Sequence, residues 1–169
     1  MFKSIYYFSF LFFAFIKPVA AFCFSSAGSS YQIDPLLLIA IAQVESGMNP
    51  KAININKGKD GKRKSEDVGL MQINSIWLGE LQGKWGITRK HLLDDACQNV
   101  YVGAYILAKN ISKNGVNWQS IGAYNAGFAN YNEPARERYS KKVYGVYLGF
   151  LAGDRNLIIG KASRGEKVL

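Results

Sequence analysis

The glutamate at position 45 has surroundings suited to acid catalysis. It ends a segment, residues 35–45 (PLLLIAIAQVE), that is apolar almost throughout. Asp34 and Pro35 are typical of a helix start, and Gly47 is typical of a helix end. A carboxyl group at the end of a buried helix is desolvated, which raises its pKa and lets it donate a proton near neutral pH. The pattern predicts a general acid at Glu45; the alternative is a helix-terminal glutamate exposed to solvent.

Two later segments add polar side chains to the candidate site. The first, residues 67–74 (DVGLMQIN), begins 22 residues further along the chain, and the second is residues 123–127 (AYNAG). Gln72, Tyr124 and Asn125 carry amide and phenol groups that can form hydrogen bonds. The alternative is an ordinary structural role, in the core for Tyr124 and in a turn for Asn125.

The segment Glu45-Ser46-Gly47, followed by these two segments in this order, resembles the lytic transglycosylases that carry a goose-type-lysozyme-like SLT domain. The resemblance covers about residues 30–147. It is most similar in size to the specialised members of the invasion-protein type that accompany secretion systems. It implies that Glu45 is the single catalytic glutamate. It assigns substrate binding or orientation of the site to Ser46, Gly69, Met71, Gln72, Tyr124, Asn125 and Tyr139.

Enzymes of this family cleave the β-1,4 bond between N-acetylmuramic acid (MurNAc) and N-acetylglucosamine (GlcNAc) in peptidoglycan. The resemblance implies that Glu45 protonates the leaving oxygen and then accepts the proton of the MurNAc 6-hydroxyl, which attacks the anomeric carbon of its own sugar. The product is a 1,6-anhydro sugar, so no protein nucleophile and no cofactor are expected. We also expect no metal site, because the chain has a single histidine, His91, and no CxxC pair.

Asp67 departs from the family pattern, because most members have serine at this position. Residues 67–74 resemble instead the D-x-G-x-x-Q-I-N segment of animal (hen-type) lysozymes, in which the aspartate is a second carboxylate. A retaining glycosidase places such a carboxylate about 5 Å from the acid. Asp67 is therefore a second catalytic candidate that favours a hydrolytic lysozyme, and the alternative is an aspartate that stabilises a turn. A further alternative for the whole chain is a non-catalytic module that binds glycan.

The pattern of apolar residues predicts a predominantly α-helical α+β protein with a lysozyme-like fold and a small β-hairpin lobe at residues 52–74. Helices are expected at residues 35–45, 75–81, 88–93, 95–113, 117–126 and 132–151, with Asp94 as the cap of the longest. Residues 25–30 are expected to be a short Ser/Gly linker. Residues 152–169 lose helical periodicity and are expected to form a basic tail that is mobile or docks elsewhere.

The N-terminus is typical of an exported protein. Residues 5–16 are apolar, with a lysine before and after them and the small residues of a V-A-A cleavage site beyond, so residues 1–21 are predicted to be a signal peptide. An uncleaved membrane anchor is the alternative. The lysozyme-like domain is assigned to residues 22–151. In an exported chain two cysteines favour a disulfide, here Cys23–Cys97, which would stabilise the fold by roughly 4 kcal/mol on the chain-entropy model.

The balance of charges indicates an anionic partner. The 169-residue chain has a formal net charge of +9, and removal of residues 1–21 leaves 148 residues at +7. With 49% hydrophobic residues the chain is neither disordered nor, at this length, a multidomain protein. Several lysines lie in the loop at residues 56–66, which is predicted to be a solvated hairpin tip. Export excludes nucleic acid, so we expect a periplasmic, monomeric enzyme that acts on peptidoglycan strands, with a secretion-system component as a further partner.

Overall fold

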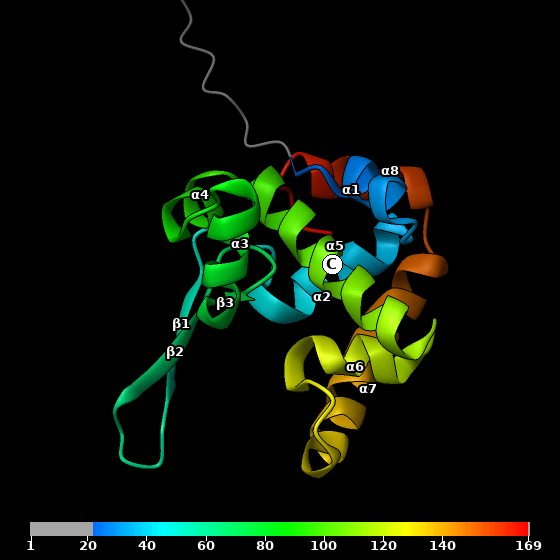
Figure 1. Ribbon diagram of the computed structural model, residues 1–169. Helices are drawn as coiled ribbons and strands as arrows, with labels where there is room; N and C mark the ends of the chain where they lie inside the picture. The colour runs from blue at the N-terminus through cyan, green and yellow to red at the C-terminus, as the bar shows by residue number, and fades with distance from the viewer. Residues whose placement is uncertain (1–21, 169) are drawn as a thin grey trace, which may run out of the picture.

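The computed structural model describes residues 22–168. Helices predominate, and a small antiparallel sheet forms a separate lobe to one side of them (Figure 1). This arrangement confirms the predicted α+β, lysozyme-like fold class. The helices are α1 (Phe24–Tyr31), α2 (Pro35–Ser46), α3 (Leu78–Trp85), α4 (Arg89–Asp94), α5 (Ala96–Asn114), α6 (Trp118–Ala126), α7 (Glu133–Leu151) and α8 (Arg155–Ser163), with 3₁₀ turns η1 (Ser75–Trp77) and η2 (Asn130–Asn132).

Helix α2 begins and ends where its sequence predicts. A side-chain oxygen of Asp34 accepts a hydrogen bond from the backbone N–H of Leu36 at 2.9 Å, and Pro35 occupies the first helical position. At the other end Gly47 adopts the left-handed conformation, with φ of 60°, that favours glycine. Half of the residues between these ends are fully buried, and α7 packs against the helix. The central position of α2 places Glu45 at the boundary between the core and the β lobe.

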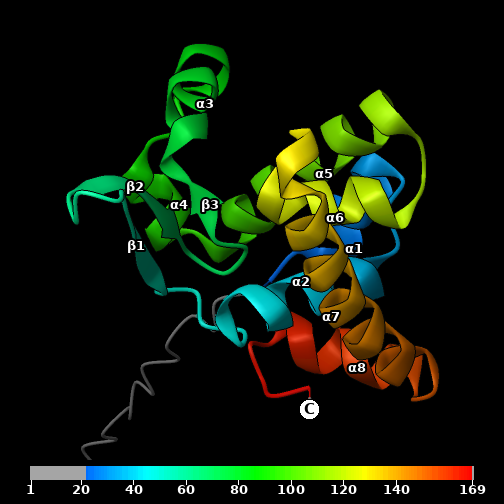
Figure 2. The same ribbon diagram turned by 90° about the horizontal axis from the view of Figure 1, so that it is seen from below.

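The β lobe is a three-stranded antiparallel sheet in the order β1-β2-β3. Strand β1 (Ile53–Lys57) and strand β2 (Arg63–Val68) form the predicted hairpin, which projects from the body of the molecule (Figures 1 and 2). A tight turn at residues 69–72 leads into the short β3 (Ile73–Asn74), which pairs with the end of β2. The sheet therefore brings Asp67 opposite Asn74, at the edge that faces the helices.

One buried ion-pair cluster attaches the hairpin to α4. The carboxylate of Glu66, which is 4% exposed, accepts hydrogen bonds from Arg89 at 2.8 and 3.0 Å and pairs with Arg63 at 2.6 Å. The hydrogen bond from Arg89 is the main reason that the pKa of Glu66 lies below its ordinary value. Arg63 therefore stabilises the base of the hairpin through this ion pair, while its side chain remains 56% exposed, as expected for the solvated loop predicted at residues 56–66.

Two helices occupy segments that were predicted to be irregular. Residues 25–30 lie within α1, whose buried Phe24, Ala27 and Gly28 face the core, and the predicted disulfide between Cys23 and Cys97 joins this end of the chain to α5. Residues 155–163 form α8, capped by the side chain of Asp154 and packed against α1 and α2. Of the two alternatives predicted for residues 152–169, a mobile tail or a docked one, this segment matches the docked one, because α8 buries Ala162 against these helices.

The cap of α5 also differs from the prediction. Asp95, not Asp94, accepts a hydrogen bond from the backbone N–H of Gln98 at 2.9 Å. Asp94 instead pairs with Lys51 and Lys90 at the surface. The predicted signal peptide at residues 1–21 lies outside the described residues. Within residues 22–168, every helix is too short or too polar to cross a membrane.

Candidate active site

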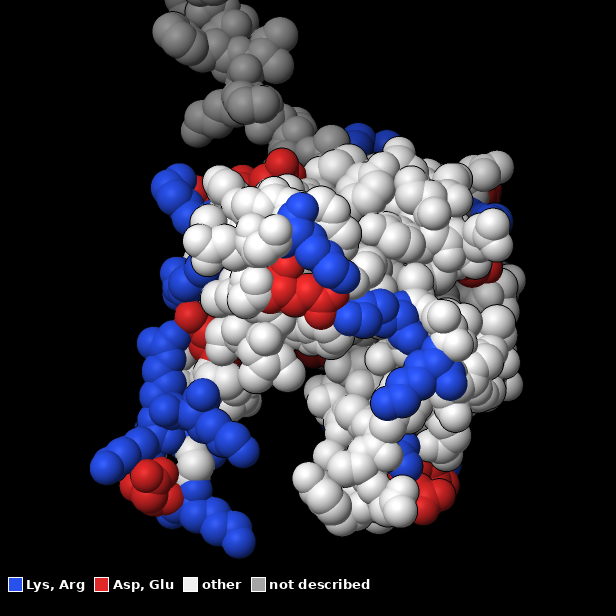
Figure 3. All heavy atoms as spheres, in the orientation of Figure 1, with Lys and Arg blue, Asp and Glu red and all other residues white. Residues whose placement is uncertain are grey.

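A cleft with a volume of about 830 Å³ separates the β lobe from α5 and α6. The strands and η1 supply one wall, and α5, α6 and the loop after α6 supply the other. Figure 3 shows the surface hollowed between the hairpin and the helices, with lysine and arginine side chains gathered on the hairpin and over α5. Of the residues predicted from the sequence, the cleft brings together Glu45, Asp67, Gln72, Tyr124 and Asn125.

Glu45 is a partly buried carboxyl group in this cleft, and its pKa is raised from 4.5 to about 7. Desolvation is the main cause, and the negative charge of Asp67 acts in the same direction. The hydroxyl of Tyr139 donates a hydrogen bond to Oε1 of Glu45 at 2.6 Å, which opposes the shift. Because Oε1 accepts from Tyr139, the acid proton of neutral Glu45 belongs on Oε2. The raised pKa favours the protonated form of Glu45 near neutral pH, which is the form that the predicted general acid needs.

Asp67 lies in the same cleft, and two asparagine side chains hold its carboxylate. The amide of Asn56 donates to Oδ2 at 2.8 Å, and the amide of Asn74 donates to Oδ1 at 2.6 Å. These donors come from β1 and β3, the two strands on either side of Asp67 in β2. Both oxygens of Asp67 therefore have a hydrogen-bond donor, and these two bonds fix the position of the carboxyl group in the cleft.

The turn at residues 69–72 can be formed only by glycine at its first position. Gly69 has a φ of 77°, and a Cβ there would lie 2.1 Å from the amide nitrogen of Asn99 and 2.7 Å from the carbonyl oxygen of Leu92. The side chain of Asn99 is fully buried and donates to Leu92 and Val68 while accepting from the backbone of Met71 at 2.7 Å. Asn99, which the sequence did not single out, therefore sets the path of this turn.

Met71 lies beneath the cleft and not on its surface. Its side chain is fully buried against Gly103 of α5, where any Cβ would lie within 3 Å of it. Gly69 is buried as well. The structure therefore corrects the interpretation of Gly69 and Met71 as substrate-binding residues: both shape the wall of the cleft from within. Gln72 does line the cleft, but its amide also donates to the carbonyls of Ala52 and Gly69, which hold the turn closed.

Ser46 and Tyr124 brace this turn from the helical side. The hydroxyl of Ser46 donates to the carbonyl of Leu70 at 2.7 Å, and the hydroxyl of Tyr124 donates to the carbonyl of Met71 at 2.8 Å. Burial raises the pKa of Tyr124 well above its usual value, so its hydroxyl remains a donor. These bonds place the β lobe at a fixed distance from α2 and α6. Asn125, in contrast, is exposed at the cleft.

Several residues of the cleft were not predicted from the sequence. Lys64, Lys109 and Lys113 give it a positive wall, and Nζ of Lys109 lies 4.9 Å from the ring centroid of Trp77. The buried guanidinium of Arg136 donates to the carbonyls at residues 127 and 129 and so fixes the loop after α6. Lys109 and Lys113 are indistinguishable from solvated helix positions in the sequence, because only the tertiary fold turns them toward the cleft. Lys64, on β2, belongs to the basic loop at residues 56–66 that the sequence singled out.

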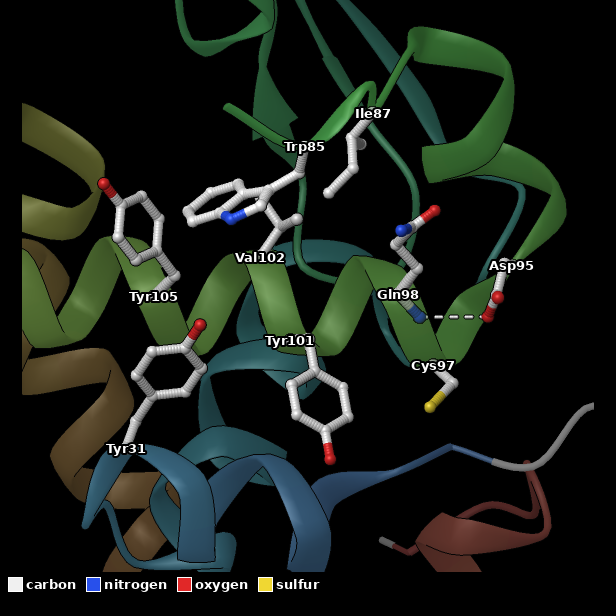
Figure 4. A pocket seen from close by; sticks show the side chains of 9 residues that line it. All are labelled: Tyr31, Trp85, Ile87, Asp95, Cys97, Gln98, Tyr101, Val102 and Tyr105. Atoms are coloured by element: carbon white, nitrogen blue, oxygen red, sulfur yellow. Dashed lines mark hydrogen bonds between the residues drawn. The ribbon is translucent and has the colours of Figure 1, made fainter. Parts of the chain in front are cut away.

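A second cavity, which we call the aromatic pocket, lies on another part of α5. It has a volume of about 420 Å³ and is lined mainly by rings from three helices (Figure 4). Trp85 and Tyr105 meet edge to face with centroids 4.9 Å apart, and Tyr31 lies 6.3 Å from Tyr105. The residues that line it are Tyr31, Trp85, Ile87, Asp95, Cys97, Gln98, Tyr101, Val102 and Tyr105.

The fold and the cleft define a lysozyme-like enzyme that acts on a glycan, and comparison with known proteins agrees. Residues 22–146 match the family model of the Transglycosylase SLT domain, so the chain belongs to this family and is a peptidoglycan lytic transglycosylase. It is 45% identical over 127 residues to the "Peptidoglycan-binding-like protein" of Escherichia coli O157:H7, which covers 74% of this chain and 75% of that protein.

Two other relatives are similar over a comparable share of the chain. The "Invasion protein IagB" of Salmonella typhimurium (strain SL1344) is 44% identical over 132 residues, which are 78% of this chain and 79% of that protein. The "X polypeptide" of Escherichia coli is 43% identical over 130 residues, or 76% and 73% of the two chains. These matches confirm the resemblance to the lytic transglycosylases that the motifs indicated.

Proposed function

We propose that Glu45 is the catalytic acid and base of a reaction that cleaves the MurNAc–GlcNAc bond and releases a 1,6-anhydro-MurNAc end. The observation that carries this proposal is the pKa of about 7 of a carboxyl group that shares a cleft with a second, fixed carboxylate. A proton donor is most effective when its pKa is close to the working pH. Glu45 meets this condition because of its burial and because of the charge of Asp67.

In the first step Oε2 of Glu45 gives its proton to the glycosidic oxygen while the bond from that oxygen to C1 of MurNAc breaks. The electron pair of the bond leaves with the GlcNAc oxygen, so positive charge develops at C1. In the second step the 6-hydroxyl oxygen of the same MurNAc bonds to C1, and its proton returns to the Glu45 carboxylate. The enzyme is restored, and no water is consumed. The attacking group is already part of the bound sugar, so proximity replaces a protein nucleophile.

Asp67 has the role of stabilising the positive charge at C1. Its carboxylate is held by Asn56 and Asn74 and is therefore fixed before the charge develops. The same placement supports a second candidate function, a hydrolytic lysozyme in which Asp67 forms a covalent bond to C1 and water completes the reaction. Tyr139 orients Glu45. Asn125 offers its amide to the sugars, and Gln72 offers the oxygen of its amide, because its nitrogen is bonded to the carbonyls of Ala52 and Gly69.

Mass analysis of digested peptidoglycan separates the two functions. Purified sacculi are treated with the wild type, with Asp67→Ser and with Glu45→Gln, and the ends of the released fragments are compared. We expect anhydro ends from the wild type, slower formation of the same ends by Asp67→Ser, and no release by Glu45→Gln. Reducing ends from the wild type that disappear in Asp67→Ser would establish the hydrolytic lysozyme instead.

We further propose that the enzyme works as a periplasmic monomer that opens the wall locally for a secretion system. The similarity to a protein named "Invasion protein IagB" supports this role, and the positive cleft suits an anionic wall. The test is a chromosomal Glu45→Gln substitution in the source bacterium. We expect loss of assembled secretion apparatus with normal growth; normal assembly with an inactive enzyme would exclude the role.

A further inference from the structure

A smaller basin continues the cleft on the other side of Glu45. It has a volume of about 240 Å³, and Glu45 and Asn125 line both the basin and the main cleft. Asp67 lines only the main cleft. The remaining wall of the basin comes from α7, including Tyr139, which holds Glu45 by its hydrogen bond.

The positions of the two carboxyl groups indicate which part of the substrate enters each cavity. Positive charge develops at C1 of the sugar that is being cleaved, so this sugar lies beside Asp67 in the main cleft. The oxygen that leaves must lie within reach of Glu45. The strand that departs with this oxygen therefore continues past Glu45, away from Asp67, into the basin. This assignment rests on the function proposed above.

The basin has two cations of its own. Arg138 and Lys142 both line it, four residues apart on α7. Neither forms a hydrogen bond or an ion pair with any side chain or backbone group in residues 22–168, whereas the adjacent Lys141 pairs with Glu137 at 2.7 Å. Like charges at this spacing destabilise a helix by a few tenths of a kcal/mol. Two unpaired positive groups beside a cleft suit a ligand that brings negative charge.

The leaving strand begins with GlcNAc, which is neutral, and the next sugar is MurNAc, which carries a lactyl group. In intact peptidoglycan the lactyl carboxyl is joined to an acidic stem peptide, and in strands without the peptide it is a free carboxylate. We propose that Arg138 and Lys142 bind a carboxylate of the leaving strand and so select anionic strands over neutral glycans. The two cations then set the direction in which a strand crosses Glu45.

The test measures binding in a Glu45→Gln background, in which the strand stays intact. The variant is Arg138→Gln/Lys142→Gln. The matched control is Lys90→Gln/Lys141→Gln, which removes two surface positive charges that line neither cavity. Calorimetry gives the Kd for three ligands: glycan strands with stem peptides, strands from which an amidase has removed the peptides, and a neutral GlcNAc oligomer.

We expect the basin variant to bind peptide-bearing strands about tenfold more weakly than the control, with no change for the neutral oligomer. If the variant also binds the strands without peptides about tenfold more weakly, the two cations contact the lactyl carboxylate. If it binds those strands as tightly as the control does, the cations contact the stem peptide. Equal Kd values for variant and control on both anionic strands would overturn the proposal, as would an equal loss on the neutral oligomer.

Catalysis by the same pair of variants, with Glu45 restored, supplies an independent measurement. We expect a higher KM on anionic strands and a kcat within twofold of the control, because the cations do not touch the reacting atoms. Fragment release by the Glu45→Gln background is measured first. Release there would show that the catalytic role of Glu45 fails, whereas intact strands with equal Kd values for variant and control would show that only the inference about the basin fails.

Discussion

The main cleft and the aromatic pocket lie along different stretches of α5, at residues 106–113 and 97–105, and differ in what their polar groups do. In the pocket these groups have structural tasks: Asp95 caps α5, Cys97 forms the disulfide, and Tyr105 donates to Glu80. In the cleft, Glu45 is strained electrostatically, with its pKa raised to about 7 by burial and by Asp67. The polar groups of the aromatic pocket stabilise the fold. In the cleft, by contrast, the fold disfavours the ionised form of Glu45.

Both regions are concave, so a cavity with an aromatic lining does not by itself indicate an active site. The cleft is distinguished by two carboxyl groups, Glu45 and Asp67, with different neighbours. Asp67 has a hydrogen-bond donor for each oxygen, while Glu45 has a phenol on one oxygen and an apolar helix behind it. Burial raises the pKa of Glu45 to about 7, and this gives one of the two acids a proton to donate near neutral pH. Variants in the two cavities test this contrast directly.

The largest effect is expected for Glu45→Gln, which keeps the shape of the side chain and removes the proton donor. Release of soluble fragments from sacculi should fall about 10³-fold, the range typical of a lost general acid. Asp94→Asn, a surface carboxylate outside the cleft, is the matched control and should stay within twofold of the wild type. More than a tenth of wild-type activity in Glu45→Gln would exclude Glu45 as the acid.

The same variant should change stability in a pH-dependent way. The pKa of Glu45 is higher in the folded protein than in the unfolded chain, so the wild type loses stability as the pH rises from about 4.5 through about 7. Glutamine has no charge to bury. Thermal or urea unfolding should therefore show similar stabilities near pH 4.5 and a more stable Glu45→Gln at pH 8, by up to about 3 kcal/mol. Equal stabilities at pH 8 would contradict the burial of Glu45.

The next largest effect concerns the position of Asp67. Asn56→Ala removes the hydrogen-bond donor to Oδ2 of Asp67. We expect kcat to fall about tenfold, the cost of one charge-assisted hydrogen bond, and KM to change less than twofold. Asn54→Ala, on the same strand and exposed, is the control. A rise in KM with unchanged kcat would show that Asn56 contacts the substrate and does not position Asp67.

A smaller effect is expected for Tyr139→Phe. The hydrogen bond from Tyr139 lowers the pKa of Glu45, so its removal should raise that pKa. Wild-type kcat/KM should decrease as the pH rises through about 7, because Glu45 loses its proton, and this decrease should move to higher pH in the variant. If the decrease in kcat/KM stays at the same pH in the variant, or moves to lower pH, it is not caused by deprotonation of Glu45.

The smallest effect on catalysis is expected in the aromatic pocket. Trp85→Ala removes the edge-to-face contact with Tyr105 and should lower the free energy of unfolding by about 1 kcal/mol, with kcat/KM within twofold of the wild type. Urea unfolding and a fragment-release assay measure the two quantities. A large loss of activity without loss of stability would show that the aromatic pocket takes part in the reaction.

Local sequence rules predicted the elements that carry their own signals. Asp34, Pro35 and Gly47 define α2, and the motif at residues 67–74 identified Asp67 as a group beside the acid. Helix α1 was missed because its Ser/Gly-rich sequence has poor helix propensity and forms against α5, where Cys23 joins Cys97. Helix α8 likewise depends on tertiary packing.

Within the site, the sequence identified residues but not their contacts. Nothing in the motif distinguishes Met71, which is buried against Gly103, from Gln72, which reaches the cleft. The buried Asn99 and Arg136 stand far from the motifs in sequence and act only through the backbone of loops they hold. Such contacts form between distant parts of the chain, so no pattern of neighbouring residues predicts them.

The most direct test of the account is the titration of Glu45 itself. Carbon NMR of the glutamate side chains follows each carboxyl group with pH, and Glu45→Gln identifies the signal. We expect that signal to titrate at about pH 7 in the wild type and at lower pH in Asp67→Asn, because the charge that raises the pKa has been removed. A Glu45 that titrates near its ordinary value of 4.5, unaffected by the change at Asp67, would contradict the proposed acid and its pairing with Asp67.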